Sequence, residues 1–174
     1  VGELAQHLFD PLGQGQFIDL HALGVKAALA KTTQLIHAPK AQPVFEAGFS
    51  ADPHKNGGAL AFADLPLPEV TENGACTAWH MVEVKSSTSV KDYYREDVAI
   101  QHYVATHAGL KLASIAIAVI DKQWVYPGGR DYQGLLKTED LTAASLAMAP
   151  QVQAWIADAQ AVVQQTQMPA CSTG

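Results

Sequence analysis

The spacing of apolar positions at the start of the chain predicts helices. Residues 3–17 mix short apolar pieces with proline and glycine, which indicates a brief helix followed by a loop. From about Leu20 to Ile36 the chain is rich in alanine and places apolar residues at helical spacing, so we expect a long helix there. Pro39 and Pro43 end it.

Three strands are predicted next. Residues 44–49 form the first, and a polar turn separates it from residues 59–65, which Pro66 and Pro68 are expected to close. The third strand runs from about Thr77 to Lys85. Strands that follow one another with short connections pair in an antiparallel meander.

The second half of the chain returns to helical spacing over residues 89–108, with Gly109 as a stop signal. Ser114 to Ile120 is apolar throughout, which is typical of a central strand covered on both faces. After Asp140 we expect a C-terminal helix that is kinked or restarts near Pro150. The predicted class is α/β, with a mixed central sheet in the order helix, strand, strand, strand, helix, strand, and an additional C-terminal helix.

Length and composition indicate the number of domains and the kind of protein. A chain of 174 residues that is 48% hydrophobic can bury one full core, so we expect a single domain over residues 1–174. No apolar run reaches the roughly 18 residues of a membrane span, and no signal-peptide pattern begins the chain, which predicts a cytoplasmic protein without membrane contact. Because the sequence starts at Val1 and stops at Gly174 without an obvious ending, we expect a piece of a longer protein, with its other domains as partners.

The net charge of −6 argues against broad attraction to phosphate backbones. Any contact with nucleic acid must therefore be local. The candidate basic positions are Lys85, Lys91 and Arg95, although acidic residues are interleaved with them and a solvated surface of mixed charge is the common alternative.

The end of the third predicted strand carries a carboxylate and an ammonium group two residues apart. Glu83 and Lys85 share one face of an extended chain, while Val84 points the other way and leaves its backbone carbonyl near the same place. Asp64 ends the preceding strand, and such oxygen ligands suit magnesium or manganese. We predict a metal site of Asp64, Glu83 and the Val84 carbonyl, the alternative being an exposed ion pair worth about 0–1 kcal/mol.

This order of elements, together with these residues and a glutamine on the following helix, resembles the PD-(D/E)XK nuclease superfamily. The resemblance is strongest to the RecB-like branch, and to a bacterial domain family of uncharacterised function whose members carry an "EVKSSTSVKD" strand. It extends from about Leu4 to Val163. The matching positions are Phe45 to Phe49, Asp64, Glu83 to Asp92, and Asp97 to Tyr103.

The resemblance implies a restriction-endonuclease-like core and a metal-dependent DNA nuclease. Asp64 and Glu83 would bind magnesium or manganese, Lys85 would assist the attacking water, and Gln101 would position the substrate. The implied catalytic residues are thus Asp64, Glu83, Lys85 and Gln101; substrate would contact Gln101, Tyr103 and Lys91; Glu46 and Asp97 are accessory candidates.

One departure keeps a second hypothesis open. RecB-like nucleases usually place a tyrosine four residues after the glutamine, and this chain has Ala105 there, with Tyr103 as an imperfect substitute. The alternative is a nuclease-fold module with weak or no catalysis that binds DNA or a protein partner.

Some relatives of this kind also hold an iron–sulfur cluster, which normally needs four thiolates. The chain has two cysteines, Cys76 and Cys171, so we expect a cluster only in a longer parent protein, where Cys171 would be the first ligand of the set.

Overall fold

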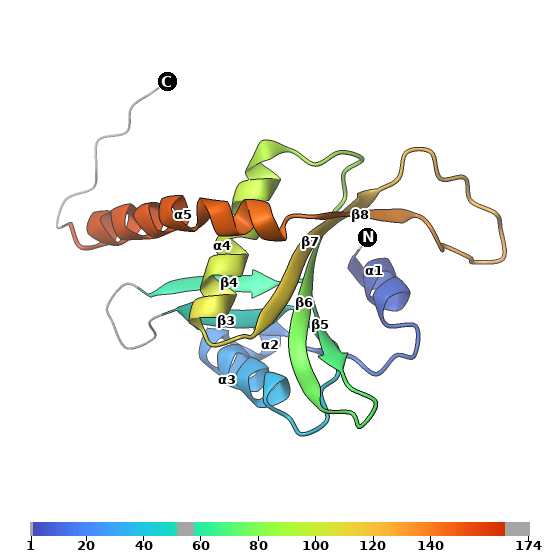
Figure 1. Cartoon of the computed structure of the whole chain (residues 1–174), viewed down its shortest axis with the longest axis horizontal. Helices are drawn as coiled ribbons and strands as arrows, with labels where there is room; N and C mark the ends of the chain where they lie inside the picture. The colour runs from blue at the N-terminus through green and yellow to red at the C-terminus, as the bar shows by residue number, and fades with distance from the viewer. Residues whose placement is uncertain (1, 52–57, 166–174) are drawn as a thin grey trace.

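A computed structural model describes residues 2–51 and 58–165. Its centre is a four-stranded sheet of order β5-β6-β7-β8, beside which β3 and β4 form a hairpin and β1 and β2 a short parallel pair. Helix α4 packs against β7 and the β3–β4 hairpin, and α5 crosses it (Figure 1). The elements are α1 Gly2–Phe9, β1 Gln16–Phe17, α2 Leu20–Leu23, α3 Val25–Ile36, β2 Val44–Phe45, β3 Ala47–Ala51, β4 Ala59–Ala63, β5 Leu65–Val70, β6 Cys76–Lys85, α4 Asp92–His107, β7 Leu112–Ile120, β8 Leu136–Asp140 and α5 Thr142–Val163.

The predicted α/β class and mixed sheet are confirmed. Strand β6 pairs antiparallel with β5 and parallel with β7, and β7 pairs antiparallel with β8. The parallel pair is joined through α4, since parallel strands need a crossover connection. As its apolar sequence predicted, β7 lies between two other strands.

Three boundaries differ from the predictions. The long helix is broken at Gly24, whose φ of 75° suits glycine and separates α2 from α3. The first strand is interrupted at Glu46 and the second at Asp64, so each becomes two strands. The second interruption places the Asp64 carboxylate beside β6, and the first places Glu46 beside Asp64.

The expectation that Pro66 and Pro68 close a strand is wrong. Strand β5 continues through both prolines to Val70, because β5 lies at the edge of the sheet. Residues two apart direct their backbone nitrogens to the same side, so both proline nitrogens face away from the ladder with β6.

Two features at the C-terminal end also differ. Strand β8 was not predicted, because its sequence LKTED is polar, as an exposed edge strand can be. Helix α5 does not restart at Pro150 but continues as one helix to Val163. Among the helices of the described residues, none combines the length and apolar character that crossing a membrane requires. Cys171 lies outside the described residues.

The two faces of the sheet are covered by different apolar clusters. On the face of α4, Met81, Ile115 and Ile117 pack with Val98 and Val104. The opposite face, covered by α1, is lined by Val82, Ala118, Leu65, Phe45 and Ala5. Apolar packing on both faces of the sheet therefore fixes β6, up to the strand end that carries Glu83 and Lys85.

A buried threonine ties α3 to β3 and gives a test of this packing. The Thr32 hydroxyl accepts a hydrogen bond from the Gly48 N–H at 2.9 Å and donates to the Ala28 carbonyl at 3.0 Å. We expect Thr32→Val to lower the free energy of unfolding by about 1–3 kcal/mol, because the buried Gly48 N–H loses its partner. Urea denaturation measures this loss.

Thr33 supplies the matched control, since its hydroxyl bonds only to the Leu29 carbonyl on the exposed face of the same helix. Thr33→Val is expected to change the free energy of unfolding by no more than about 0.5 kcal/mol. Equal losses in the two variants would contradict the role assigned to Thr32.

Candidate active site

The register of β5 on β6 brings Asp64 to Glu83. Leu65 pairs with Val82, so extending the antiparallel register by one residue sets Asp64 opposite Glu83. The Val84 N–H donates a hydrogen bond of 2.8 Å to Asp64 Oδ2. Because a residue paired across an antiparallel ladder directs its N–H and C=O to the same neighbour, the Val84 carbonyl also points to the side of Asp64. The two predicted carboxylates and this backbone oxygen thus lie along one stretch of β6.

Glu46 extends this arrangement by one strand. Ala47 pairs with Ala63, and the Glu46 N–H donates to the Asp64 carbonyl at 3.1 Å, so Glu46 stands beside Asp64 as Asp64 stands beside Glu83. Glu46 has a φ of 59°, in the left-handed region that is unfavourable for a residue with a side chain. The fold therefore maintains a strained backbone at the accessory carboxylate.

The backbone strain at Glu46 can be measured with two substitutions. Glu46→Gly and Glu46→Ala both remove the carboxylate, but only glycine relieves the left-handed φ. We expect the glycine variant to be more stable than the alanine variant by about 1 kcal/mol in chemical denaturation with EDTA present. If alanine were equally stable, the backbone at position 46 would not be strained.

Lys85 joins two carboxylates from different elements. Its Nζ lies 2.7 Å from Glu83 Oε1 and 2.6 Å from Asp97 Oδ2 on α4. Burial lowers the pKa of Lys85, but the hydrogen bonds that Lys85 donates to Asp97 and Glu83 outweigh this effect and raise the pKa above its ordinary value. Lys85 is therefore a fixed ammonium group at neutral pH.

Glu83 is the most deeply placed acid of the set. It is only 6% exposed, and its Oε2 atom is buried without a hydrogen-bond partner among the described residues. Burial and the charge of Asp64 raise the pKa of Glu83, while Lys85 and the neighbouring Gln101 side chain act in the opposite direction. A cation is one group that could satisfy this buried carboxylate oxygen.

The charges of the whole group are unbalanced. Burial, together with the Glu46 and Asp97 charges, raises the pKa of Asp64 against the lowering effect of the Val84 N–H and Lys85. Burial and then the charge of Glu83 raise the pKa of Glu46. Four carboxylates thus lie in this group, and two of them contact the Lys85 ammonium. A divalent cation would relieve the excess of negative charge.

Open space adjoins two of the carboxylates, Glu46 and Asp64, on the side of α1. A cavity of about 160 Å³ lies there, and Ser86 at the end of β6 contributes to its wall. Neither Ser86 nor the α1 residues of this cavity were selected from the sequence. The lining residues are Gly2, Gln6, Glu46, Asp64, Leu65, Val84 and Ser86.

Helix α4 forms the other side of the candidate site. Gln101 is buried at 5% exposure beside Glu83. The Tyr94 ring lies 5.4 Å from Lys85 Nζ and 5.7 Å from Lys91 Nζ, so this ring connects the site to an exposed lysine. Tyr94 was not selected from the sequence, although it precedes Asp97 by three residues and therefore lies on the same side of the helix.

Other predicted residues lie elsewhere. Tyr103 does not join the site: it is two residues from Gln101, a spacing that turns it to another face of α4, where it stacks on His107 with ring centroids 3.9 Å apart. Arg95 is paired with Glu139 of β8 at 2.7 Å. Ala105 is fully buried in the core.

Within residues 2–51 and 58–165, no three His, Cys, Asp or Glu side chains form a ready-made metal-binding group. At this site Asp97 Oδ2 and Glu83 Oε1 are held by Lys85. Oxygens that Lys85 does not contact remain on Asp64, whose Oδ2 accepts the Val84 N–H, on Glu46, at the Val84 carbonyl, and at Glu83 Oε2, which has no hydrogen-bond partner among the described residues. Cys76 is partly buried near the start of β6, where its thiol contacts the Ala78 carbonyl, away from these groups.

Comparison with known proteins adds no further assignment. No protein-family model matches the chain, and a search of curated proteins gives no match. The function is therefore argued from the geometry of Asp64, Glu83 and Lys85.

Proposed function

We propose that the protein is a metal-dependent DNA nuclease. The observation that carries this proposal is the buried Oε2 of Glu83, which has no hydrogen-bond partner among the described residues. It lies near Asp64, and the other oxygen of the same carboxylate accepts a hydrogen bond from the Lys85 ammonium. An unpaired buried carboxylate oxygen is costly unless a cation or a donor completes it.

Asp64, Glu83 and the Val84 carbonyl would hold the ion. All three offer oxygen, which suits magnesium or manganese rather than zinc. When bound, such an ion neutralises charge on a phosphodiester and makes a bound water a nucleophile at neutral pH. The raised pKa values of Asp64 and Glu83 describe the protein without that positive charge.

Lys85 would act as a donor. An ammonium whose pKa is raised does not accept a proton from water at neutral pH, so Lys85 would orient the water or hold the phosphate as a point charge. Gln101, buried beside Glu83, would fix the orientation of this carboxylate and of the substrate.

Lys91 and Tyr94 would contact the substrate strand at the border of the site. Lys91 is exposed and lies 5.7 Å from the centre of the Tyr94 ring. A cation next to an aromatic ring suits a phosphate with its adjoining base. In a chain of net charge −6, such local contacts must supply the attraction to nucleic acid.

The test is cleavage of labelled single-stranded and duplex DNA by purified protein. We expect cleavage with magnesium or manganese and none in EDTA. Failure to cleave either substrate with either metal would contradict the proposal.

A second candidate function is a nuclease-fold module that binds DNA or a protein partner without cutting. Two observations favour it: Lys85 is already satisfied by two carboxylates, and the buried Ala105 replaces the tyrosine expected of RecB-like nucleases. DNA binding that persists in EDTA, without cleavage in any metal, would select this candidate over the first.

A further inference from the structure

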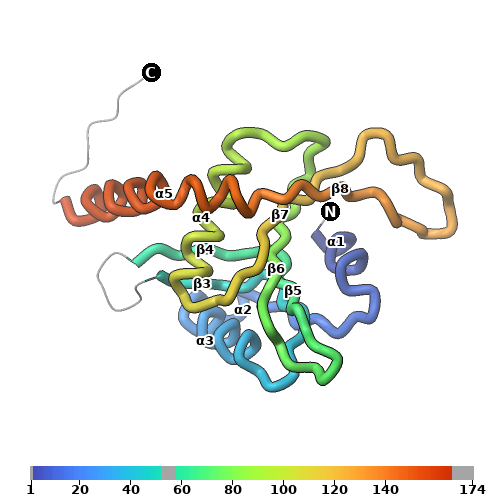
Figure 2. Tube along the Cα trace, viewed as in Figure 1, coloured from blue at the N-terminus to red at the C-terminus, as the bar shows by residue number. Residues whose placement is uncertain are grey.

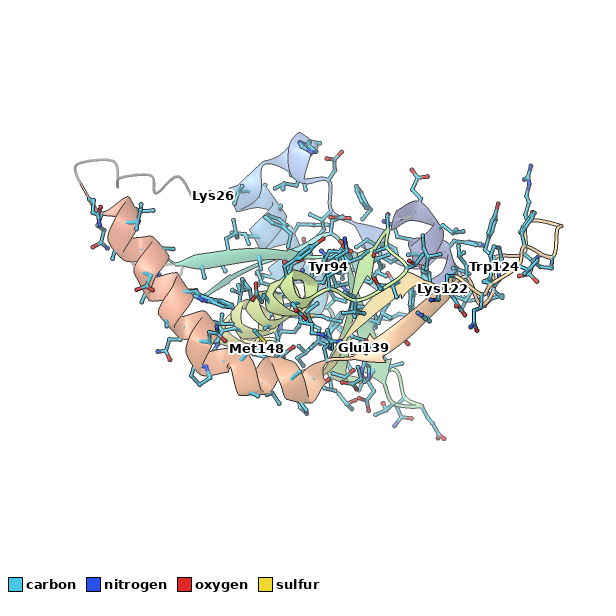
Figure 3. The ribbon with its side chains drawn as sticks, turned by 90° about the horizontal axis from the view of Figure 1, so that it is seen from above. Lys26, Tyr94, Lys122, Trp124, Glu139 and Met148 are labelled. Atoms are coloured by element: carbon cyan, nitrogen blue, oxygen red, sulfur yellow. The ribbon has the colours of Figure 1, made fainter. Side chains whose placement is uncertain are left out.

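The connection between β7 and β8 carries a group of aromatic rings that the proposed catalytic site does not use. We name residues 121–135 the aromatic loop; its rings are Trp124, Tyr126 and Tyr132. The ring centroids of Tyr126 and Tyr132 lie 5.3 Å apart, and those of Trp124 and Tyr132 lie 6.2 Å apart. Figure 2 shows the loop extending beyond the ends of both strands, and Figure 3 shows Trp124 and Lys122 at the end of the molecule remote from the far end of α5.

Hydrogen bonds hold this loop in one arrangement. The Trp124 Nε1–H donates to the Gln133 carbonyl at 2.8 Å, and the Arg130 N–H donates to the Tyr126 hydroxyl at 2.8 Å. Gly128, Gly129 and Arg130 follow one another with φ values of 94°, 64° and 62°. Arg130 thus has a left-handed backbone, which is unfavourable for a residue with a side chain.

The rings remain accessible. Tyr126 is 47% exposed and the adjacent Val125 is 82% exposed, while Trp124 and Tyr132 are half-buried mainly against each other and their own loop. A pair of stacked rings with open faces is a surface on which a flat group can stack.

The loop carries two cations that can contact phosphates and two acids, so its formal net charge is zero. Its two acids are engaged in turns, since Asp121 accepts from the Gln123 N–H and Asp131 accepts from the Gln133 N–H. Its two cations, Lys122 and Arg130, are exposed and form no ion pair with any described residue. Rings flanked by uncommitted cations match the bases and phosphates of a nucleic acid strand.

The loop starts beside the candidate active site. The Ile120 N–H, at its base, donates to the Ser87 carbonyl at 2.8 Å, two residues after Lys85. The Asp121 N–H donates to the Leu135 carbonyl at 2.8 Å and closes the base of the loop. A strand bound on the rings would therefore continue toward Glu83 and Lys85.

We infer that the aromatic loop binds single-stranded nucleic acid by stacking bases on its rings, and that it delivers the strand to the site. Delivery of the strand to the site rests on the proposed function, but binding on the rings does not require catalysis. A single strand is specified because the bases of a duplex are already stacked on each other and cannot reach the rings.

The experiment measures binding of fluorescently labelled oligothymidylate of about 20 nucleotides in EDTA, by anisotropy; this exceeds the roughly 4–16 nucleotides that a small binding fold covers. We expect Trp124→Ala and Tyr126→Ala each to weaken binding about 5- to 150-fold. Arg130→Ala should reduce the slope of log affinity against log salt by about 0.7. Val125→Ala, in the same loop but without a ring, is the control and should bind as the parent does.

Tyr126→Phe keeps the ring and removes the hydroxyl, so it should retain binding and shows whether the ring or the loop conformation matters. Thermal melting of every variant checks that the domain remains folded. The inference is overturned if the parent does not bind the strand in EDTA, if it binds an equivalent duplex more tightly, or if both alanine variants bind like Val125→Ala. If the parent protein binds the strand but cleaves no DNA with either metal, the proposed function is contradicted and the loop inference stands.

Discussion

Glu83→Gln is expected to abolish DNA cleavage, with a loss of at least about 100- to 1000-fold in kcat. Glutamine keeps the shape of the side chain but removes the charge of the buried carboxylate that adjoins Asp64. Lys85→Ala should cause a loss of similar size, because it removes the ammonium that contacts Glu83 and Asp97. Initial rates at saturating magnesium measure both variants.

Matched controls separate this effect from a general loss of charge. Glu69→Gln changes an exposed glutamate on β5, and Lys137→Ala an exposed lysine on β8. Both controls should cut at the parental rate. If Glu83→Gln cut as fast as Glu69→Gln, the assignment of the site would be wrong.

Asp64→Asn is expected to make the metal-free protein more stable and to remove its response to metal. An asparagine oxygen can still accept the Val84 N–H, but the charge that raises the pKa of Glu83 is gone. In EDTA the melting temperature should rise by about 2–4 °C, the effect of about 1 kcal/mol in a domain of this size. The parent alone should be stabilised by manganese, by about 2.7 kcal/mol at 100 times the dissociation constant.

The pH dependence supplies a check on the sign of this effect. The folded pKa values of Asp64 and Glu83 lie above their ordinary values of 3.8 and 4.5, so the folded protein retains these protons to higher pH than the unfolded chain. Their contribution to the free energy of unfolding in EDTA therefore falls as pH rises from these ordinary values through the raised pKa values of the folded protein. The difference between Asp64→Asn and the parent should grow over the same window; a difference that shrinks would contradict repulsion between the carboxylates.

The sequence predicted those elements in which periodicity and burial agree. Strand β6, helix α4 and the central β7 were predicted because each has apolar residues at the spacing of its own element. Met81 in β6, Val98 in α4 and Ile117 in β7 are examples, and all three are buried. Strand β8 was missed since an exposed edge strand carries no apolar alternation. Pro66 misled because a proline ends a central strand but is tolerated at an edge.

The proximity of Asp64, Glu83 and Lys85 followed from strand spacing and the resemblance, and the fold brings these residues together. Glu46 could be selected only as an accessory residue, because its place beside Asp64 depends on a left-handed backbone and a strand break that no periodicity reveals. The partners of Lys85 and the aromatic rings stacked in the β7–β8 loop depend on tertiary contacts, which a linear pattern does not encode.

The most direct test of a metal-dependent site is the anomalous scattering of manganese in crystals of the protein. The account predicts a peak with oxygen ligands from Asp64, Glu83 and the Val84 carbonyl, at about 2.0–2.2 Å, with Glu83 Oε2 no longer unpartnered. Crystals that contain manganese but show no peak there, with Lys85 still holding Glu83 and Asp97, would contradict it.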